Sequence, residues 1–417
     1  MHQVDVAIIG GGALGICTAH YLRAMGRRVA VIEKGEVAAG SSYDNAGMIV
    51  PSHSVPLAEP GVIGQGLKWM LDPESPFYIK LRWDRALWRW LWQFYRACRS
   101  EQVRRAMPLL RDLHLESLRL YAELDALGEL EFGFGRRGRL LVCNSDRGLE
   151  GVVQESRHMR ELGLQVEVLD AEGVQEIEPA VSFACRGGVF YPQDAHLDPT
   201  RFVRALARHV EHRGGEIHSA TEVLGFIREG RRICAIETTR GTFSAAEVVL
   251  AGGTWTPGLA RGLGLELPIQ PAKGYSVTVA RPSRFPATPF MLTEAKVAVT
   301  PMGKTLRFAG TMELAGMDLA INQRRVGALL RAIRDYVPDY DPEQFDVREI
   351  WRGLRPCTPD GLPLLGRPQQ WDNLTLAAGH ASIGMSLAPA SGQLVARLVE
   401  RQDPGMEISL LRVERFA

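Results

Sequence analysis

The stretch that most limits how this chain can fold is Gly-Gly-Gly-Ala-Leu-Gly at residues 10–15. An apolar run at residues 4–9 precedes it, and an amphipathic run at residues 13–25 follows and ends at Gly26. In the GxGxxG spacing the first glycine makes a tight turn, the second admits a pyrophosphate and the third lets a helix pack on a strand. The N-terminus of that helix would face the phosphates. The stretch therefore predicts a strand, a turn and a helix that form a Rossmann-type dinucleotide site.

Glu33 narrows the choice of dinucleotide. It follows a second apolar run at residues 29–32 and lies eighteen residues after Gly15. A carboxylate there accepts hydrogen bonds from free ribose hydroxyls and would repel a 2′-phosphate, which argues against NADP. FAD and NAD both remain open. A glycine turn that merely closes a strand–helix–strand unit would explain the glycines but not their combination with Glu33.

Composition excludes several classes of protein. The chain has 417 residues, which suggests two domains, and its 49 Lys and Arg against 48 Asp and Glu leave no strong field to attract nucleic acid. The six cysteines form no CxxC pair, and no metal-ligand spacing is present. The sequence has neither a signal-peptide pattern nor an apolar run long enough to cross a membrane. We expect a reduced, cytoplasmic protein without a metal site or a nucleic-acid partner.

The remaining chain alternates between α/β and mostly β patterns. Helices are predicted at residues 199–213, 323–336 and 388–401, and strands at 216–226, 233–239, 248–251, 269–279, 295–301, 305–311 and 374–377. No internal repeat or linker separates them, so the two domains are expected to be interleaved. We predict a Rossmann-type α/β domain from residues 1–85, 196–262 and 350–417. Residues 86–195 and 263–349 would form an α+β substrate domain on a large mixed or antiparallel sheet.

Several further blocks carry a family resemblance. They are Gly-Ser-Ser-Tyr-Asp-Asn-Ala-Gly-Met at 40–48, Lys-Gly-Tyr-Ser at 273–276, Arg-Phe-Ala-Gly-Thr-Met-Glu at 307–313, Trp-Arg-Gly-Leu-Arg-Pro-Cys-Thr-Pro-Asp-Gly at 351–361 and Gly-His-Ala-Ser-Ile-Gly-Met at 379–385. With these blocks the chain resembles the D-amino-acid oxidase superfamily of flavoproteins over nearly its whole length, and within it the bacterial D-amino-acid dehydrogenases. The resemblance implies a GR2-like domain that binds FAD non-covalently.

It also implies a reaction, the oxidative deamination of a D-amino acid to an imine and then a 2-oxo acid, by hydride transfer to flavin N5. A cyclic substrate such as D-proline or D-hydroxyproline is one option. Electrons would pass to a quinone or another carrier. Two alternatives stay open: an oxygen-using oxidase of the glycine or sarcosine type, and a non-catalytic FAD subunit that relays electrons in a larger complex.

The resemblance assigns cofactor contacts along the whole chain. These are Gly10, Gly12, Ala13, Leu14, Gly15, Glu33, Lys34, Ser41, Ser42, Asn45, Ala46, Gly47, Met48, Val223, Ala251, Gly252, His380, Ala381, Ser382, Ile383, Gly384 and Met385. Ser41 and Ser42 would offer hydroxyls to the phosphate or ribityl chain, residues 46–48 would line the isoalloxazine, and Val223 would meet the adenine. The helix after His380 would stabilise negative charge at the N1/C2=O edge of reduced flavin. His380 itself is either part of that edge or a hydrogen-bonded turn residue.

Four residues are candidates to contact the substrate. Arg355, in a Gly-Leu-Arg-Pro motif, would hold the substrate carboxylate with its two-pronged guanidinium, unless it belongs to a structural ion pair. Tyr275 would place a hydroxyl near the substrate only if its strand turns that face inward. Met48 would line the pocket, and His53 is either a polar contact there or a surface-loop residue. No side chain is predicted to act as acid or base, because the protein's task in this chemistry is to orient the substrate.

Residues 69–99 combine five tryptophans with many arginines. On a helix, Arg82, Arg85, Arg89 and Arg96 would form one stripe, with Trp and Leu on the other faces. Such a helix suits the inner membrane face, where arginines meet anionic lipid, or a partner subunit. Alternatively it is a helix buried by its own domain with solvated arginines.

Overall fold

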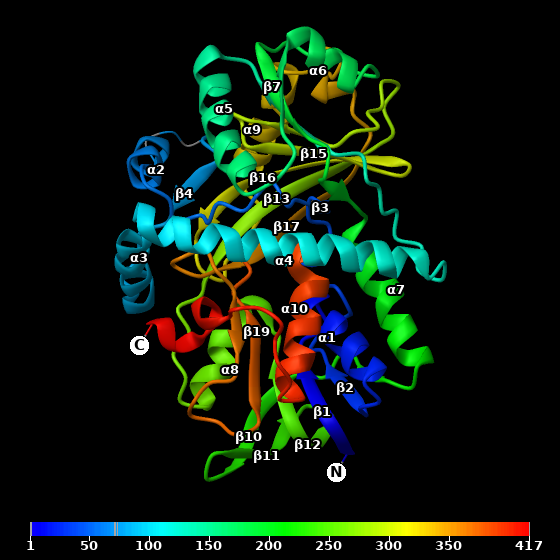
Figure 1. Cartoon of the computed structure of the whole chain (residues 1–417), viewed down its shortest axis with the longest axis vertical. Helices are drawn as coiled ribbons and strands as arrows, with labels where there is room; N and C mark the ends of the chain where they lie inside the picture. Colours follow the sequence, from blue (N-terminus) through cyan, green and yellow to red (C-terminus); the bar gives the residue numbers. More distant parts are fainter. Residues whose placement is uncertain (1, 71, 73, 417) are drawn as a thin grey trace.

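Two large sheets organise this computed structural model, which describes residues 2–70, 72 and 74–416 (Figure 1). The first has eight strands, in the order β10-β11-β12-β1-β2-β9, with β19 paired to β12 and β18 to β19. Its strands are β1 (His2–Ile9), β2 (Val29–Ile32), β9 (Glu216–His218), β10 (Val223–Glu229), β11 (Arg232–Thr238), β12 (Gly241–Leu250), β18 (Leu364–Gly366) and β19 (Leu374–Ala378). The pairs that join β9, β2, β1, β12 and β19 are parallel, as a Rossmann-type sheet requires.

The second sheet has nine strands, in the order β17-β13-β16-β15-β14-β5-β7-β6, with β4 paired to β16. They are β4 (Phe77–Ile79), β5 (Arg139–Cys143), β6 (Glu167–Asp170), β7 (Gly187–Tyr191), β13 (Gln270–Ala280), β14 (Phe290–Leu292), β15 (Val297–Met302), β16 (Thr305–Leu314) and β17 (Val347–Cys357). Most neighbours are antiparallel, whereas β5 with β14 and β4 with β16 are parallel. A short ribbon of β3 (Met48–Ile49) and β8 (Ala195–His196) completes the strands of the described residues. The predicted mixed α/β class, with a large mixed sheet, is confirmed.

Helices cover the sheets and join them. They are α1 (Ala13–Ala24), α2 (Val62–Met70), α3 (Arg85–Ala97), α4 (Ser100–Ala126), α5 (Asp146–Glu161), α6 (Ala171–Ile177), α7 (Pro199–His212), α8 (Thr256–Gly262), α9 (Gln323–Arg334) and α10 (Gly384–Val399). Short 3-10 turns follow β12, α9 and α10 at η1 (Gly253–Trp255), η2 (Pro342–Gln344), η3 (Ser409–Leu411) and η4 (Val413–Phe416). The long helix α4 crosses the middle of the molecule between the two sheets (Figure 1). Within the described residues, none of the helices has the length and apolar character that a membrane span requires.

The opening of the chain follows the predicted pattern closely. Strand β2 occupies the four predicted residues, and α1 begins at Ala13 and ends one residue before its cap at Met25. Helix α10 begins at Gly384, four residues before the predicted start at 388, and Pro389 lies inside it. Helices α1 and α10 touch where a Cβ on Gly392 would lie 2.6 Å from Cys17 Cβ. This close packing brings the N-terminal ends of the two helices to the same part of the molecule.

Three elements lie outside the domain to which the predicted ranges assign them. Strands β4 and β17 pair within the second sheet, although residues 1–85 and 350–417 were predicted to belong to the first domain. Helix α4 packs Leu110, Leu113 and Tyr121 into the core formed by α1 and α10. Pairing and packing depend on contacts between distant parts of the chain, so no local pattern could locate these boundaries. We propose domain boundaries that follow the two sheets, with α4 as the element between them.

The arginine and tryptophan segment differs from its predicted arrangement. Helix α3 begins only at Arg85, so Arg82 lies before it and donates to Gln270 and to the Leu314 carbonyl. The buried face of α3 carries Leu87 and Trp90, and the Trp90 indole donates to the Cys357 carbonyl over 2.9 Å. Its exposed face carries arginines and aromatic residues together: Arg85, Trp88, Arg89, Trp92, Tyr95 and Arg96. The prediction that Trp and Arg occupy different faces was therefore wrong for Trp88 and Trp92.

Candidate active site

The glycine turn at the end of β1 is shaped so that only glycine fits. Gly10 has φ +118°, and a Cβ there would lie 2.5 Å from the Ala251 carbonyl oxygen. A Cβ on Gly15 would lie 1.9 Å from the Gly10 carbonyl oxygen, so α1 packs directly on the turn. Helix α1 has no side-chain cap at Gly12, while Ser42 Oγ accepts the N–H of Ala13 over 2.9 Å. The narrow glycine surface at this helix N-terminus fits the approach of a pyrophosphate.

Glu33 lies against this turn at the end of β2. Its carboxylate accepts N–H groups from Gly11 and Gly35 at 2.7 and 2.8 Å. Its backbone accepts the N–H of Thr221, two residues before Val223 opens β10. The structure thus brings the glycine turn, the acidic strand end and the Ala251–Gly252 loop together, as the dinucleotide prediction requires.

Lys34 and Trp255 contact each other near this site. Lys34 was among the predicted cofactor residues, whereas Trp255 was not. The Lys34 ammonium lies 3.7 Å from the centre of the Trp255 ring, and burial lowers the pKa of this lysine. Trp255 also lies near Gly40, at 3.8 Å from a Cβ placed there. Trp255 follows Ala251-Gly252-Gly253-Thr254 directly in the sequence, and this proximity to a predicted loop was the available signal.

The loop at residues 40–48 is held from the second sheet. Asn45 closes it from within, donating to the Ser41 carbonyl over 3.1 Å and accepting the Gly47 N–H over 2.9 Å. The carbonyls of the loop accept hydrogen bonds from three residues on β13, β15 and β16, namely Ser276, Thr300 and Arg307. Arg307 also pairs with the Asp44 carboxylate at 2.8 Å. These three anchors were not predicted, although Ser276 and Arg307 lie in blocks that carried the resemblance.

The two predicted serines have different partners in this loop. Ser42 contacts the α1 N-terminus, as described above, whereas the Ser41 hydroxyl donates to the Leu354 carbonyl on β17. Ser41 therefore links the cofactor loop to the strand that carries Arg355. Its bond to the phosphate or ribityl chain stays a prediction.

His380 has a hydrogen-bonding partner within the fold. Its side chain is buried, its Nε2 lies 3.0 Å from Ser391 Oγ, and burial lowers its pKa to about 3. The imidazole is therefore neutral near pH 7. The Ala381 N–H donates to the Pro356 carbonyl, which binds this loop to β17. Ile383, the residue before α10, offers no side-chain cap to the helix. The N–H groups of the first turn form the positive end of the helix dipole, next to the His380 loop.

Arg355 is a partly buried cation without an acidic partner among the described residues. Its guanidinium donates to the Thr311 carbonyl over 2.7 Å and lies over Gly274, where a Cβ would be 2.2 Å from Nη1. Within the part of the chain that the structure describes, no carboxylate lies within salt-bridge distance of it. Burial lowers the pKa of Arg355, because the surrounding protein penalises its charge. The alternative of a structural ion pair is therefore not supported.

The structure places the Tyr275 side chain on the face of β13 opposite to Arg355, unlike the predicted substrate contact. Successive residues of a strand point to opposite faces, and Gly274 occupies the face of β13 that Arg355 covers. The Tyr275 side chain is buried in the core of the second sheet, and its hydroxyl accepts the Asn322 N–H over 3.2 Å. It therefore cannot contact a substrate bound at Arg355 in this conformation.

His53 lies in the loop that follows β3. It is accessible to solvent, yet the surrounding protein lowers its pKa to about 4, with further contributions from Arg139 and Lys296. Met48, at the start of β3, is half-buried and follows the flavin-loop residues directly. His53 can thus offer a neutral imidazole as donor or acceptor, not a positive charge.

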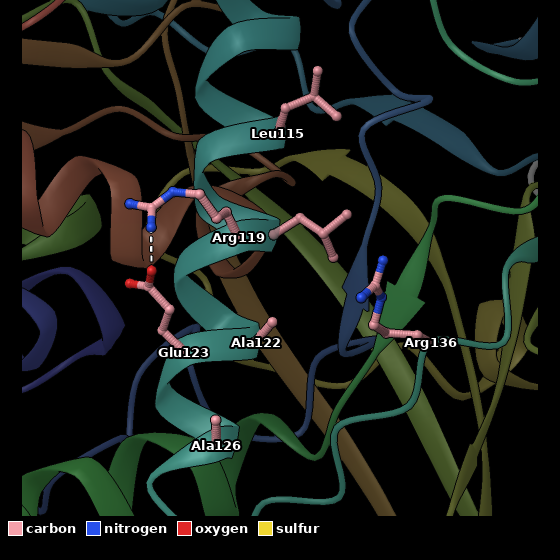
Figure 2. Close-up of a pocket in the computed structure, with 7 residues that line it drawn as sticks. Leu115, Arg119, Ala122, Glu123, Ala126 and Arg136 are labelled. Atoms are coloured by element: carbon pink, nitrogen blue, oxygen red, sulfur yellow. Dashed lines mark hydrogen bonds and ion pairs between the residues drawn. The ribbon is translucent and has the colours of Figure 1, made fainter.

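One hollow on the surface lies outside this site. It lies along α4 and is lined by Leu115, Leu118, Arg119, Ala122, Glu123, Ala126 and Arg136 (Figure 2). Arg119 bridges Glu116 and Glu123 along the helix there. None of the predicted cofactor or substrate residues lines it, so it has no part in the chemistry proposed below.

Comparison with known proteins agrees with this geometry. The family model described as DAO, FAD dependent oxidoreductase, matches residues 5–398. The D-amino acid dehydrogenases of Granulibacter bethesdensis and Bradyrhizobium diazoefficiens are each 32% identical to this chain, over 99% of both proteins. The crystal structure of glycine oxidase from Geobacillus kaustophilus is 26% identical, with a TM-score of 0.81 and 99% of each chain covered. The predicted cofactor and enzyme class are confirmed, and the chain belongs to the DAO family of FAD-dependent oxidoreductases.

Proposed function

We propose that this protein oxidises the CH–NH bond of a D-amino acid, as an FAD-dependent dehydrogenase. The observation that carries the proposal is the partly buried guanidinium of Arg355, which has no carboxylate partner in the described chain. A buried charge is costly unless it is paired, so the site is complete only when an anion binds there. The carboxylate of an amino acid provides that anion and matches the guanidinium with two hydrogen bonds. The names of the two relatives at 32% identity support the same substrate class.

Two groups of residues would bind the cofactor and the substrate. The turn at residues 10–15 and Glu33 would hold the phosphates and ribose of FAD, and residues 45–48 with the start of α10 would hold its ring system. When bound, FAD accepts the hydride that leaves the substrate Cα, so that the amine becomes an imine which water hydrolyses to the oxo acid. Arg355 binds the carboxylate and so selects which Cα–H faces the cofactor.

Acid–base side chains have little to do in this arrangement. The amine must be neutral for its lone pair to assist the departure of hydride, and the substrate loses that proton to solvent or to a neutral acceptor. His53, whose pKa is lowered to about 4, is a neutral imidazole and too weak a base to hold that proton, so it can offer only a hydrogen bond. His380 is buried and its Nε2 lies 3.0 Å from Ser391 Oγ.

A panel of amino acids tests the proposal directly. Anaerobic addition of a D-amino acid to the FAD-loaded protein should bleach the oxidised flavin, and the L-enantiomer should not. The panel includes D-proline and D-hydroxyproline, whose faster bleaching would establish the cyclic preference, together with glycine and N-methyl amino acids. Bleaching by none of them would contradict the enzyme and support a subunit that only relays electrons.

A second candidate is an oxidase of the glycine type, which the similarity to glycine oxidase favours. Both candidates would bind the same carboxylate at Arg355, and they differ in the acceptor of the electrons. Hydrogen peroxide formed in air at one equivalent per substrate would support the oxidase. Turnover that requires an added quinone or dye would support the dehydrogenase.

We also propose that the electrons pass to a membrane quinone and that the protein docks on the cytoplasmic face of the inner membrane through α3. The loop before α3 exposes Leu81 and Trp83, and Trp83 is fully exposed. Trp88, Trp92 and Tyr95 continue this apolar surface along the helix, interleaved with Arg85, Arg89 and Arg96. Exposed indoles beside arginines suit the headgroup region of an anionic bilayer.

Flotation with anionic vesicles measures this docking. The wild-type protein should float with vesicles that contain an anionic lipid and stay behind with neutral ones. Since each basic residue near an anionic surface contributes about 1 kcal/mol, Arg85→Glu with Arg89→Glu should weaken binding by more than about tenfold. Trp83→Ser with Trp92→Ser should weaken it as well.

The control variant is Leu224→Ser, which removes an equally exposed apolar side chain from β10 on the other sheet. It should float like the wild type. Equal flotation of the α3 variants and the wild type, or no flotation of the wild type, would exclude the membrane and leave a soluble carrier protein as the acceptor.

A further inference from the structure

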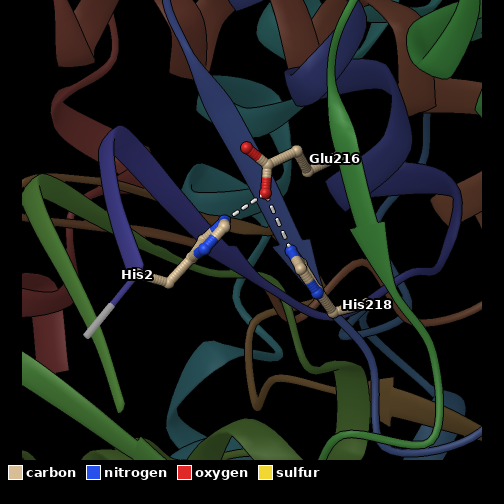
Figure 3. Close-up of side chains that lie close together, drawn as sticks. All are labelled: His2, Glu216 and His218. Atoms are coloured by element: carbon tan, nitrogen blue, oxygen red, sulfur yellow. Dashed lines mark hydrogen bonds and ion pairs between the residues drawn. The ribbon is translucent and has the colours of Figure 1, made fainter. Parts of the chain in front are cut away.

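Three side chains of metal-ligating types, none of them a predicted site residue, meet at the edge of the first sheet. His2 lies on β1, and Glu216 and His218 lie on β9. Both imidazoles direct Nε2 at the same oxygen of Glu216, with His218 Nε2 at 3.0 Å (Figure 3). The three ligand atoms all lie within 4.8 Å of one another. Positions two apart on a strand share a face, which explains why Glu216 and His218 point the same way.

The rings are held in place by packing as well as by the carboxylate. The His2 and His218 rings meet edge to face, with centroids 5.2 Å apart. Each also contacts the Phe243 ring edge to face, at 5.3 and 4.9 Å. Phe243 is a buried residue of the sheet core, so it forms a firm wall behind both imidazoles. Ligands that are already oriented lose little conformational entropy when an ion binds.

The charges of the cluster suit a cation. The three side chains remain 31 to 45% exposed, so an ion and its water ligands can reach them. Partial burial raises the pKa of Glu216, but hydrogen bonds from both imidazoles lower it by more, and the carboxylate is ionised. Arg28 lies near Glu216, and its charge is offset by a pair with Asp5 at 2.9 Å.

We propose that His2, Glu216 and His218 bind a divalent transition metal ion of the zinc class. Without an ion, both imidazoles must carry a proton on the nitrogen that faces one oxygen. A metal ion replaces these protons and takes two imidazole nitrogens and one carboxylate oxygen as ligands. This N₂O set suits Zn²⁺ and similar ions, whereas Mg²⁺ and Ca²⁺ prefer oxygen ligands alone. Water completes the coordination on the exposed side.

Such an ion would have a structural effect on the cofactor domain. It would tie the start of β1 to the edge strand β9, which otherwise pairs only with β2 in the described residues. The His218 carbonyl accepts the N–H of Glu33, which is the predicted ribose contact. The metal site is therefore joined to Glu33 by one backbone hydrogen bond. Binding to the native state alone should raise the melting temperature in proportion to the logarithm of ion concentration.

Zinc titration of the FAD-loaded protein tests the site. The tag-free protein is treated with a chelator, dialysed and titrated with Zn²⁺ in a calorimeter, with the melting temperature measured in parallel. We expect one ion per chain, and at saturating zinc a melting temperature higher by about 2 °C or more. Glu216→Gln, which keeps the shape and one hydrogen-bond acceptor, and His2→Ala with His218→Ala should each weaken binding at least tenfold and abolish the thermal shift.

The matched control is His212→Ala, an exposed histidine beside Glu211 on α7 and outside the cluster. It should bind zinc as the wild type does. Flavin absorbance confirms that each variant is folded, and Glu216→Gln keeps the test open should the double alanine variant unfold. Zinc binding that is absent in the wild type, or that the cluster variants and His212→Ala lose equally, would overturn the proposal.

Discussion

Replacement of Arg355 by leucine should lower kcat/KM for the D-amino acid substrate by about a hundredfold or more, with FAD still bound. The guanidinium is partly buried, and in the described structure its side chain makes one hydrogen bond, to the Thr311 carbonyl. No carboxylate in the described chain neutralises its charge. Removal of one partner of a buried charge pair costs about 2–5 kcal/mol, which corresponds to roughly thirtyfold to several thousandfold in rate constant. Steady-state kinetics and the flavin absorbance of the purified variant measure both parts of the expectation.

The comparison with Arg355→Lys sharpens the result. Lysine keeps the positive charge but loses the planar pair of donors, so it should recover only part of the lost kcat/KM. An amine substrate without a carboxylate should be oxidised equally by the wild type and by Arg355→Leu. If Arg355→Leu instead loses FAD, or if it keeps wild-type kinetics, then Arg355 does not bind the substrate carboxylate.

Replacement of Gly274 by alanine should weaken substrate binding as the loss of Arg355 does, although Arg355 keeps its charge. The new Cβ would lie 2.2 Å from Arg355 Nη1, so the guanidinium must move away from its present position. The end of an arginine side chain is flexible, and we therefore expect the protein to fold and to keep FAD. Displacement of a binding group by about 1 Å can cost on the order of a hundredfold in rate. We expect kcat/KM to fall by about tenfold to a hundredfold, mainly through KM.

The control for this variant is Gly151→Ala on α5, where an added Cβ meets no atom within 4 Å. It should leave the kinetics unchanged. The double variant Gly274→Ala with Arg355→Leu is the sharper measure, because the two changes should not add if both act through the same guanidinium. Additive losses would show that Gly274 has a separate role.

The cofactor half of the site was predictable because its signals are local. The turn at residues 10–15 needs glycines for reasons that are contained in a single strand–turn–helix unit, and Glu33 follows at the end of the next strand. Family resemblance added the block at residues 40–48, but it could not show which atoms hold that block. The anchors Ser276, Thr300 and Arg307 lie more than two hundred residues away and reach the loop only through the second sheet.

The substrate half depended on which face of a strand each side chain occupies. Tyr275 and Gly274 are neighbours in the sequence, yet strand alternation places one in the core and the other beneath Arg355. A shift of one residue in the pairing of β13 with β17 would exchange the two faces, and that register is set by the packing of the whole sheet. Sequence reasoning could therefore name Arg355 but not exclude Tyr275.

The sequence by itself determined the dinucleotide turn and the acidic strand end, because short-range sterics and fixed spacing decide those features. The family resemblance added the flavin and named Arg355 as the candidate for carboxylate binding. Only the tertiary structure decided that Arg355 has no acidic partner among the described residues, that β17 belongs to the second sheet and that His380 contacts Ser391. It also brought His2 to Glu216, which lies 214 residues away. Each of these depends on contacts between distant segments, and such contacts form only when the buried faces of two sheets and their helices pack together.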